Sequence, residues 1–124
     1  MAKRILLLAL VGVLSCFIFL SCASSPQSSS TPATPSITIV NGTGYTVWYV
    51  LVSPVDSDEW GRDLLDSDQT LPTGESFTYV LPQPPSTHYD IMLVDSDGDS
   101  YIKMRVNVAE SSKIVFTFDD FVGN

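Results

Sequence analysis

The stretch YDIMLVDSDGDSYIKMRVNV, residues 89–108, carries the clearest structural pattern in the chain. Two runs in which apolar and polar side chains largely alternate flank the dipeptide Asp97-Gly98. Alternation with a period of two is typical of a strand with one buried face, and Asp-Gly between two such runs is the strongest short-range signal of a β-hairpin. In the second run we expect the apolar side chains to face the core and the polar ones to face solvent: Ile102, Met104, Val106 and Val108 inward, Lys103, Arg105 and Asn107 outward.

The same period extends to both sides of this hairpin. Short segments rich in β-branched and aromatic residues lie at 37–39, 45–53, 76–81 and 113–118. Turn residues separate them, and the Asn-Gly-Thr-Gly of 41–44 supplies the positive φ that a tight turn needs. The sequence therefore predicts an all-β domain over residues 37–122, either a small antiparallel β-sandwich of about six to eight strands or a partly closed barrel.

One segment departs from the β pattern. Asp56 and Glu59 have the spacing of a capping box, and Trp60 and Leu64 are four residues apart, so that they would share one face of a helix. We therefore expect one short helical turn near residues 57–65, held against the sandwich by its apolar side chains, Trp60, Leu64 and Leu65.

The first 21 residues predict a cleaved signal helix. Lys3 and Arg4 form a basic n-region, the run 5–20 is almost entirely apolar, and small residues follow it. This run is somewhat shorter than the ~20 residues of a membrane-spanning helix. Because basic residues stay on the cytoplasmic side, we expect the rest of the chain to be exported.

The end of this segment, Phe19-Leu20-Ser21-Cys22, resembles the lipobox of bacterial lipoproteins. It departs from the usual pattern, because Phe19 stands where Leu is commonest and Leu20 where a small residue is preferred. The resemblance implies that Cys22 becomes the mature N-terminus and carries thioether-linked diacylglycerol and usually an N-acyl chain such as palmitate. A weaker second candidate for the modified cysteine is Cys16.

Residues 22–36 predict a lipidated cysteine followed by a disordered tether, since 23–36 contain only Ala, Ser, Thr, Pro and Gln. We therefore expect a lipid-anchored, extracytoplasmic protein of the bacterial cell envelope. The ordinary alternatives are a signal peptide with an incidental cysteine and an uncleaved anchor.

Several short motifs together resemble a small module that recurs in exported bacterial proteins of unknown function. They are IVNGTGYTVWY (39–49), VSP (52–54), WGRDLL (60–65), LPTGES (71–76), YDI (89–91) and DGDSY (97–101). The resemblance implies a compact β-sandwich and a non-enzymatic role, and it transfers no functional residues.

Charge narrows the classes of partner. After residue 22 the chain has four basic and 14 acidic residues, a net charge of −10. This argues against a nucleic-acid partner, which requires a basic surface, and suits a cationic partner, calcium or simple solubility near anionic lipid.

Alternate carboxylates at Asp95, Asp97 and Asp99 make weak calcium candidates, alone or shared with the acidic loop (Asp56, Asp58, Glu59, Asp63, Asp66 and Asp68). The spacing does not match an EF-hand, which would need Gly where Ser100 stands and Glu where Val106 stands. A solvated hairpin turn explains the same residues, so we assign no metal ligands and no cofactor.

Enzymatic chemistry finds little support in the sequence. His88 is the only histidine, and no Gly-rich phosphate loop or dinucleotide fingerprint is present. We therefore predict a non-enzymatic binding or structural module. The alternatives are a calcium-stabilised adhesion or accessory subunit of a surface complex and a small carboxylate-dependent hydrolase.

The aromatic residues of 45–53 suggest where such a module would bind. This segment has apolar residues at both odd and even positions, which point to opposite faces of a strand. Some of its rings would therefore lie on the outer face of a sheet. Trp48 and Tyr49 are the weak binding candidates, for a protein or a glycan, against the alternative that they pack in the core.

Overall fold

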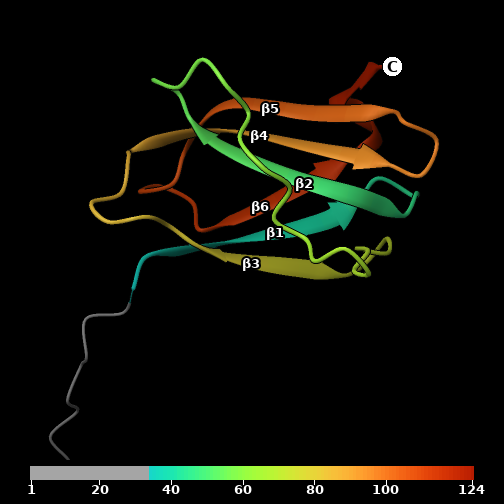
Figure 1. Cartoon of the computed structure of the whole chain (residues 1–124), viewed down its shortest axis with the longest axis horizontal. Coiled ribbons are helices and arrows are strands. Elements are labelled where there is room, and N and C mark those ends of the chain that lie inside the picture. The colour runs from blue at the N-terminus through green and yellow to red at the C-terminus, as the bar shows by residue number, and fades with distance from the viewer. Residues whose placement is uncertain (1–33) are drawn as a thin grey trace, which may run out of the picture. The chain divides into compact units, whose positions relative to one another are not determined.

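The computed structural model describes residues 34–124, and the predicted signal peptide, Cys16, Cys22 and most of the predicted tether lie outside them. The described chain forms seven strands and one 3₁₀ turn (Figure 1). These are β1 (Ser36–Gly42), β2 (Val47–Pro54), β3 (Ser76–Val80), β4 (His88–Asp95), β5 (Ser100–Asn107), β6 (Lys113–Thr117), η2 (Phe118–Asp120) and β7 (Phe121–Gly123). The prediction of an all-β fold is confirmed.

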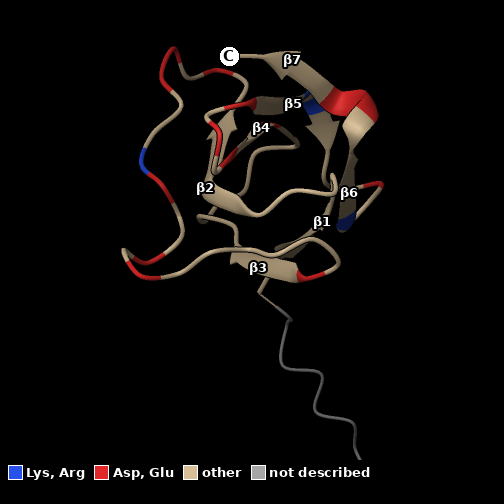
Figure 2. Cartoon of the chain, turned by 90° about the vertical axis from the view of Figure 1, so that its right-hand side faces the viewer, with Lys and Arg blue, Asp and Glu red and all other residues tan. Residues whose placement is uncertain are grey.

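Two sheets form the domain, one in the order β3-β1-β6 and one in the order β2-β4-β5-β7 (Figures 1 and 2). All neighbouring strands are antiparallel except β1 and β6, which run parallel. The predicted hairpin at Asp97-Gly98 joins β4 to β5, and Gly98 has a φ of 88° there. The strand segments expected from the period of two are therefore present, arranged as a sandwich with one parallel pair.

The core lies between the two sheets and draws side chains from both. Alternating residues of the strands are buried in it, together with three leucines from the connecting loops that close its sides. The buried apolar residues are Ile37, Ile39, Val47, Val50, Val52, Leu65, Leu71, Leu81, Tyr89, Ile91, Leu93, Tyr101, Ile114 and Phe116. Burial of this apolar surface supplies the main driving force for folding.

A bulge in β5 overturns part of the expected alternation. Tyr89 pairs with Val106 and Ile91 with Lys103, so Met104 and Arg105 both lie opposite Asp90. Arg105 has a φ of 54°, and its backbone N–H donates to Asp90 Oδ1 at 2.7 Å. Because the extra residue shifts the alternation, Met104 is 60% exposed and Lys103 lies on the inward side, contrary to the prediction. Ile102, also predicted to face inward, pairs with Met92 and lies outside the buried row that contains Tyr101 and Leu93.

The helical turn predicted near residues 57–65 is wrong, because this segment is an irregular loop. Its polar side chains bond to backbone groups and so compete with a helix. Ser57 Oγ donates to Glu59 O at 3.0 Å, and Asp63 Oδ1 accepts from the backbone N–H of Leu65 at 3.1 Å. Gly61 has a φ of 77°, in the left-handed region that ends a helix. Leu65 is nevertheless buried in the core, as expected.

Asn41 is a buried hydrogen-bonding residue where a simple tight turn was expected. Its side-chain amide donates to Tyr45 O and Leu71 O, both at 2.8 Å. Its Oδ1 accepts from the backbone N–H and the hydroxyl of Thr43, at 3.1 and 2.8 Å. The positive φ that was predicted here belongs to Gly44 (94°). Asn41 therefore ties the connection between β1 and β2 to the loop that precedes β3.

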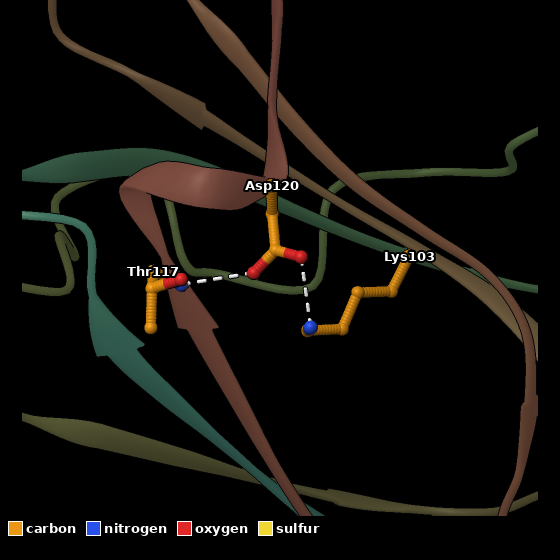
Figure 3. A network of polar contacts seen from close by, with 3 residues as sticks. All are labelled: Lys103, Thr117 and Asp120. Atoms are coloured by element: carbon orange, nitrogen blue, oxygen red, sulfur yellow. Dashed lines mark hydrogen bonds and ion pairs between the residues drawn. The ribbon is translucent and has the colours of Figure 1, made fainter.

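An ion pair fixes the last turn of the domain (Figure 3). Lys103 Nζ lies 2.8 Å from Asp120 Oδ1, and Asp120 Oδ2 accepts from the backbone N–H of Thr117 at 2.9 Å. The Lys103 ammonium also lies 5.5 Å from the centroid of the Phe116 ring. These contacts hold η2 between the two sheets and account for the inward position of Lys103.

A candidate binding cleft beside Trp48 and Tyr49

A second bulge, near the start of β2, places two successive aromatic rings on the surface. Val47 pairs with Asp95 and Tyr49 with Val94, so Trp48 is the additional residue. Val47 and Val50 are fully buried on either side, whereas Trp48 and Tyr49 are 49% and 47% exposed. A regular strand would turn one of two successive side chains inward, and the bulge removes that constraint. Both rings therefore lie at the surface, which is one of the two placements that the sequence left open.

The loop between β2 and β3 runs beside these rings and is fixed at both ends. At one end the Leu64 N–H donates to Val50 O at 2.8 Å, and the Val50 N–H donates to Asp63 Oδ1 at 2.9 Å. At the other end Leu71 and Val47 exchange two backbone hydrogen bonds, at 3.0 and 2.9 Å. Anchored in this way, the loop forms a defined wall against β2.

Between this wall and the two rings lies a cleft of about 350 Å³. Its lining combines the aromatic pair with carboxylates, hydroxyls and one amide, and includes no Lys or Arg. The lining residues are Trp48, Tyr49, Asp63, Asp66, Ser67, Asp68, Gln69 and Thr70. Figure 2 shows the acidic colouring that follows this loop on the left of the molecule. The cleft is therefore an acidic site with an aromatic wall.

The three aspartates of the cleft differ in what they bond. Asp63 Oδ1 accepts from the backbone N–H groups of both Val50 and Leu65, so this side chain shapes the loop. Within residues 34–124 no hydrogen bond or ion pair reaches the carboxylates of Asp66 and Asp68, whose residues are exposed. Asp66 and Asp68 are thus the groups available to a ligand.

The cleft lies toward the end of the domain opposite its first described residues. β1 begins at Ser36, pairs there with Val80, and ends at Gly42 next to the connection to β2 (Figure 1). Trp48 and Tyr49 are the second and third residues of β2. The chain therefore enters the sandwich at one end and presents the aromatic pair near the other.

Asp95, the first of the calcium candidates, is a buried turn residue. It is only 2% exposed. Its Oδ1 accepts from the backbone N–H groups of Asp97 and Asp99 at 2.9 and 3.0 Å, and its Oδ2 accepts from the Tyr101 hydroxyl at 3.2 Å. These three bonds explain why an aspartate stands at this position of the hairpin.

The carboxylates of Asp95, Asp97 and Asp99 do not converge. In the part of the chain that the structure describes, no group of three or more His, Cys, Asp or Glu side chains is arranged to hold a metal ion. The calcium candidates and the acidic loop therefore contribute no preformed cage to the described domain.

Tyr101 is the one described group with a strongly shifted pKa. Burial and the hydrogen bond to Asp95, with the nearby charges of Asp95 and Asp99, raise the pKa of Tyr101 from 10.0 to about 12. The native state therefore keeps the Tyr101 proton over a range in which the unfolded chain loses it. Its contribution to stability is complete below pH 10 and is lost as the pH rises from about 10 to 12.

We expect Tyr101→Phe to lower the free energy of unfolding by about 1 kcal/mol at pH 7, through loss of the hydrogen bond to Asp95. The difference between the variant and the wild type should shrink between about pH 10 and 12. Urea unfolding at a series of pH values measures this, with the exposed Tyr49→Phe as the control. A difference that stays constant with pH would contradict the assigned role of Tyr101.

Sequence reasoning did not find the whole of the exposed aromatic surface. Phe118 of η2 and Phe121 of β7 are exposed beside Tyr45, near the start of β2, and their rings stack with centroids 5.5 Å apart and an angle of 4°. It also treated the acidic loop only as a source of calcium ligands, and did not place it beside Trp48. The sequence does hold a signal for that placement. Two apolar residues, Leu65 and Leu71, flank residues 66–70, and because both are buried they hold the acidic loop against the sandwich.

Comparison with protein-family models, with curated proteins and with solved structures finds no match for this chain. The resemblances to bacterial lipoproteins and to an exported module therefore stay predictions from the sequence. Among the described residues, no helix is long and apolar enough to span a membrane.

Proposed function

We propose that the protein is a membrane-anchored, exported lipoprotein whose β-sandwich acts as a non-enzymatic binding module at the bacterial envelope. The observation that carries the binding function is the pair of half-exposed rings, Trp48 and Tyr49, in an ordered cleft. Large aromatic residues are enriched at protein interfaces and among the residues that dominate binding energy. Rings that fill the core of this domain are buried, as Tyr89 and Tyr101 are at 2% and 1% exposure.

The anchor of this proposal is Cys22, after the apolar run and the small residues of the signal peptide. A diacylglyceryl group and an N-acyl chain bury enough methylenes, at ~0.8 kcal/mol each, for an essentially permanent attachment. The 14 residues of 23–36 would span roughly 20 Å as a flexible coil.

The acidic surface suits the same role. A net charge of −10 after residue 22 keeps the domain off anionic headgroups and disfavours non-specific attachment to them. Retention at the membrane would then depend on the lipid alone, leaving the protein surface free for a partner.

Trp48→Ala tests the binding function. The soluble chain 23–124 contains the whole described core and would be incubated with the isolated envelope fraction of its host bacterium, and the sedimented fraction measured. We expect Trp48→Ala to weaken co-sedimentation roughly 10- to 100-fold, as for the loss of a central interface aromatic.

The matched control is Met104→Ala, which removes another exposed apolar side chain of the same sheet, outside the cleft. It should co-sediment like the wild type. Equal retention of the wild type and Trp48→Ala would contradict the assignment of the cleft, and equal losses in the two variants would indicate non-specific adhesion of apolar surface.

A further inference from the structure

We propose that the Trp48–Tyr49 cleft receives a cationic side chain of a protein partner, an arginine guanidinium. This inference rests on the proposed binding function and specifies its ligand. Its basis is the combination, in one cleft, of two exposed aromatic rings with carboxylates that no basic residue of the described domain neutralises.

Charge complementarity identifies the sign of the ligand. The loop 56–68 has six acidic residues and a single basic one, Arg62, which does not line the cleft. In residues 34–124 the single ion pair is Lys103–Asp120, so no internal cation occupies Asp66 or Asp68. A positively charged group would gain two carboxylates here, whereas an anion would meet only repulsion.

The aromatic wall favours a planar cation over a compact one. A guanidinium can stack on an indole or phenol ring and still direct its N–H groups to a carboxylate in its own plane. Trp48 and Tyr49 line the cleft with aromatic rings, and Asp66 and Asp68 line it with carboxylate acceptors. An ammonium group would make the ion pair without the stacked, bidentate arrangement.

The size of the cleft suits a single side chain and its immediate backbone. A volume of about 350 Å³ is at the low end of small-ligand sites. The β2 bulge and the backbone bonds of Asp63 fix the two walls, so the geometry is present before a ligand arrives. A preformed site of this kind loses less entropy on binding.

The test is a titration of the ¹⁵N-labelled chain 23–124 followed through its two indole N–H signals. The probe is the peptide acetyl-Gly-Arg-Gly-Gly-Arg-Gly-amide, and its match is the same peptide with citrulline for arginine, which keeps the shape but not the charge. We expect the arginine peptide to shift the indole signal of Trp48. The indole signal of Trp60, which lies outside this cleft, should not move and serves as the internal reference. The citrulline peptide should bind at least 10-fold more weakly.

Two charge-matched double variants locate the acceptors. The double variant Asp66→Asn with Asp68→Asn should bind the arginine peptide about 10-fold more weakly. The double variant Asp56→Asn with Asp58→Asn, in the same loop but outside the cleft, should change the affinity for this peptide less than twofold. Equal losses in the two double variants, equal binding of the citrulline peptide, or an unshifted Trp48 signal would each overturn the proposal.

The outcome is separable from that of the proposed function. If co-sedimentation with the envelope depends on Trp48 while the arginine peptide leaves its signal unmoved, the binding module stands and the cationic ligand is wrong. A neutral oligosaccharide that shifts Trp48 would then identify a glycan as the ligand. If both experiments fail, the binding function itself is refuted.

Discussion

Asn41→Asp is expected to destabilise the domain by about 3–5 kcal/mol at neutral pH, a large part of the total stability of a small domain. The substitution keeps the oxygen that accepts from Thr43 and replaces the amide that donates to Tyr45 O and Leu71 O. A buried carboxylate oxygen would then face two carbonyl oxygens without a donor. Urea unfolding at pH 7 measures the loss.

The pH dependence and a reverse substitution check this explanation. Protonation of the introduced carboxyl removes the charge, so the variant should recover part of its stability as the pH is lowered below neutrality. Asp95→Asn makes the opposite change at another buried side chain whose partners are all donors. Because the Tyr101 hydroxyl can rotate to accept, we expect a cost below about 1.5 kcal/mol there. A cost below 1 kcal/mol for Asn41→Asp would show that Asn41 does not hold the β1–β2 connection.

Cys22→Ala is expected to abolish incorporation of a labelled fatty acid, an all-or-none effect. The lipobox-like Phe19-Leu20-Ser21-Cys22 places the favoured candidate thiol, Cys22, next to the expected cleavage point. Alanine has no sulfur atom to carry a thioether. Metabolic labelling of the full chain, followed by mass spectrometry of its N-terminal peptide, measures both the lipid and the point of cleavage.

The control for this prediction is Cys16→Ala, which should leave labelling unchanged and retain a mature N-terminus at Cys22. Labelling that survives in Cys22→Ala and disappears in Cys16→Ala would assign the modification to Cys16. An unlabelled wild-type chain would refute the lipoprotein interpretation and leave an ordinary signal peptide or an uncleaved anchor.

The strands could be predicted because their signal is local. The alternating residues of 89–95 and 113–117 produce buried inward faces in the structure, and Asp97-Gly98 forms the turn between β4 and β5. The parallel pairing of β1 with β6 could not be predicted, since it joins residues about 75 positions apart and has no pattern within either strand.

Bulges were the main source of error in placing individual side chains. An extra residue in β5 exposes Met104, and one in β2 exposes both Trp48 and Tyr49. A bulge is defined by the partner strand, so the residues of one strand do not reveal it. The same limit left the exposure of the binding candidates open at the sequence level, although the residues themselves were identified.

Polar side chains explain the other errors. Asp56 and Glu59 have capping-box spacing, yet the loop uses Ser57 and Asp63 to bond backbone groups that a helix would have paired internally. Asn41 looked like a turn residue because asparagine is common in turns, and its buried partners Tyr45 and Leu71 lie in separate segments. Such partners become visible only once the segments are brought together.

The central claim is that Trp48 is exposed for contact with another molecule and is not required by the fold. The most direct test is the free energy of unfolding of Trp48→Ala, measured by urea denaturation of chain 23–124. Because the Trp48 ring is 49% exposed, we expect its removal to lower the free energy of unfolding by less than about 1 kcal/mol. The reference variant is Phe116→Ala, which removes a fully buried ring and should lower it by about 3–5 kcal/mol. A cost of 3 kcal/mol or more for Trp48→Ala would show that its ring is part of the packing, and would contradict the claim.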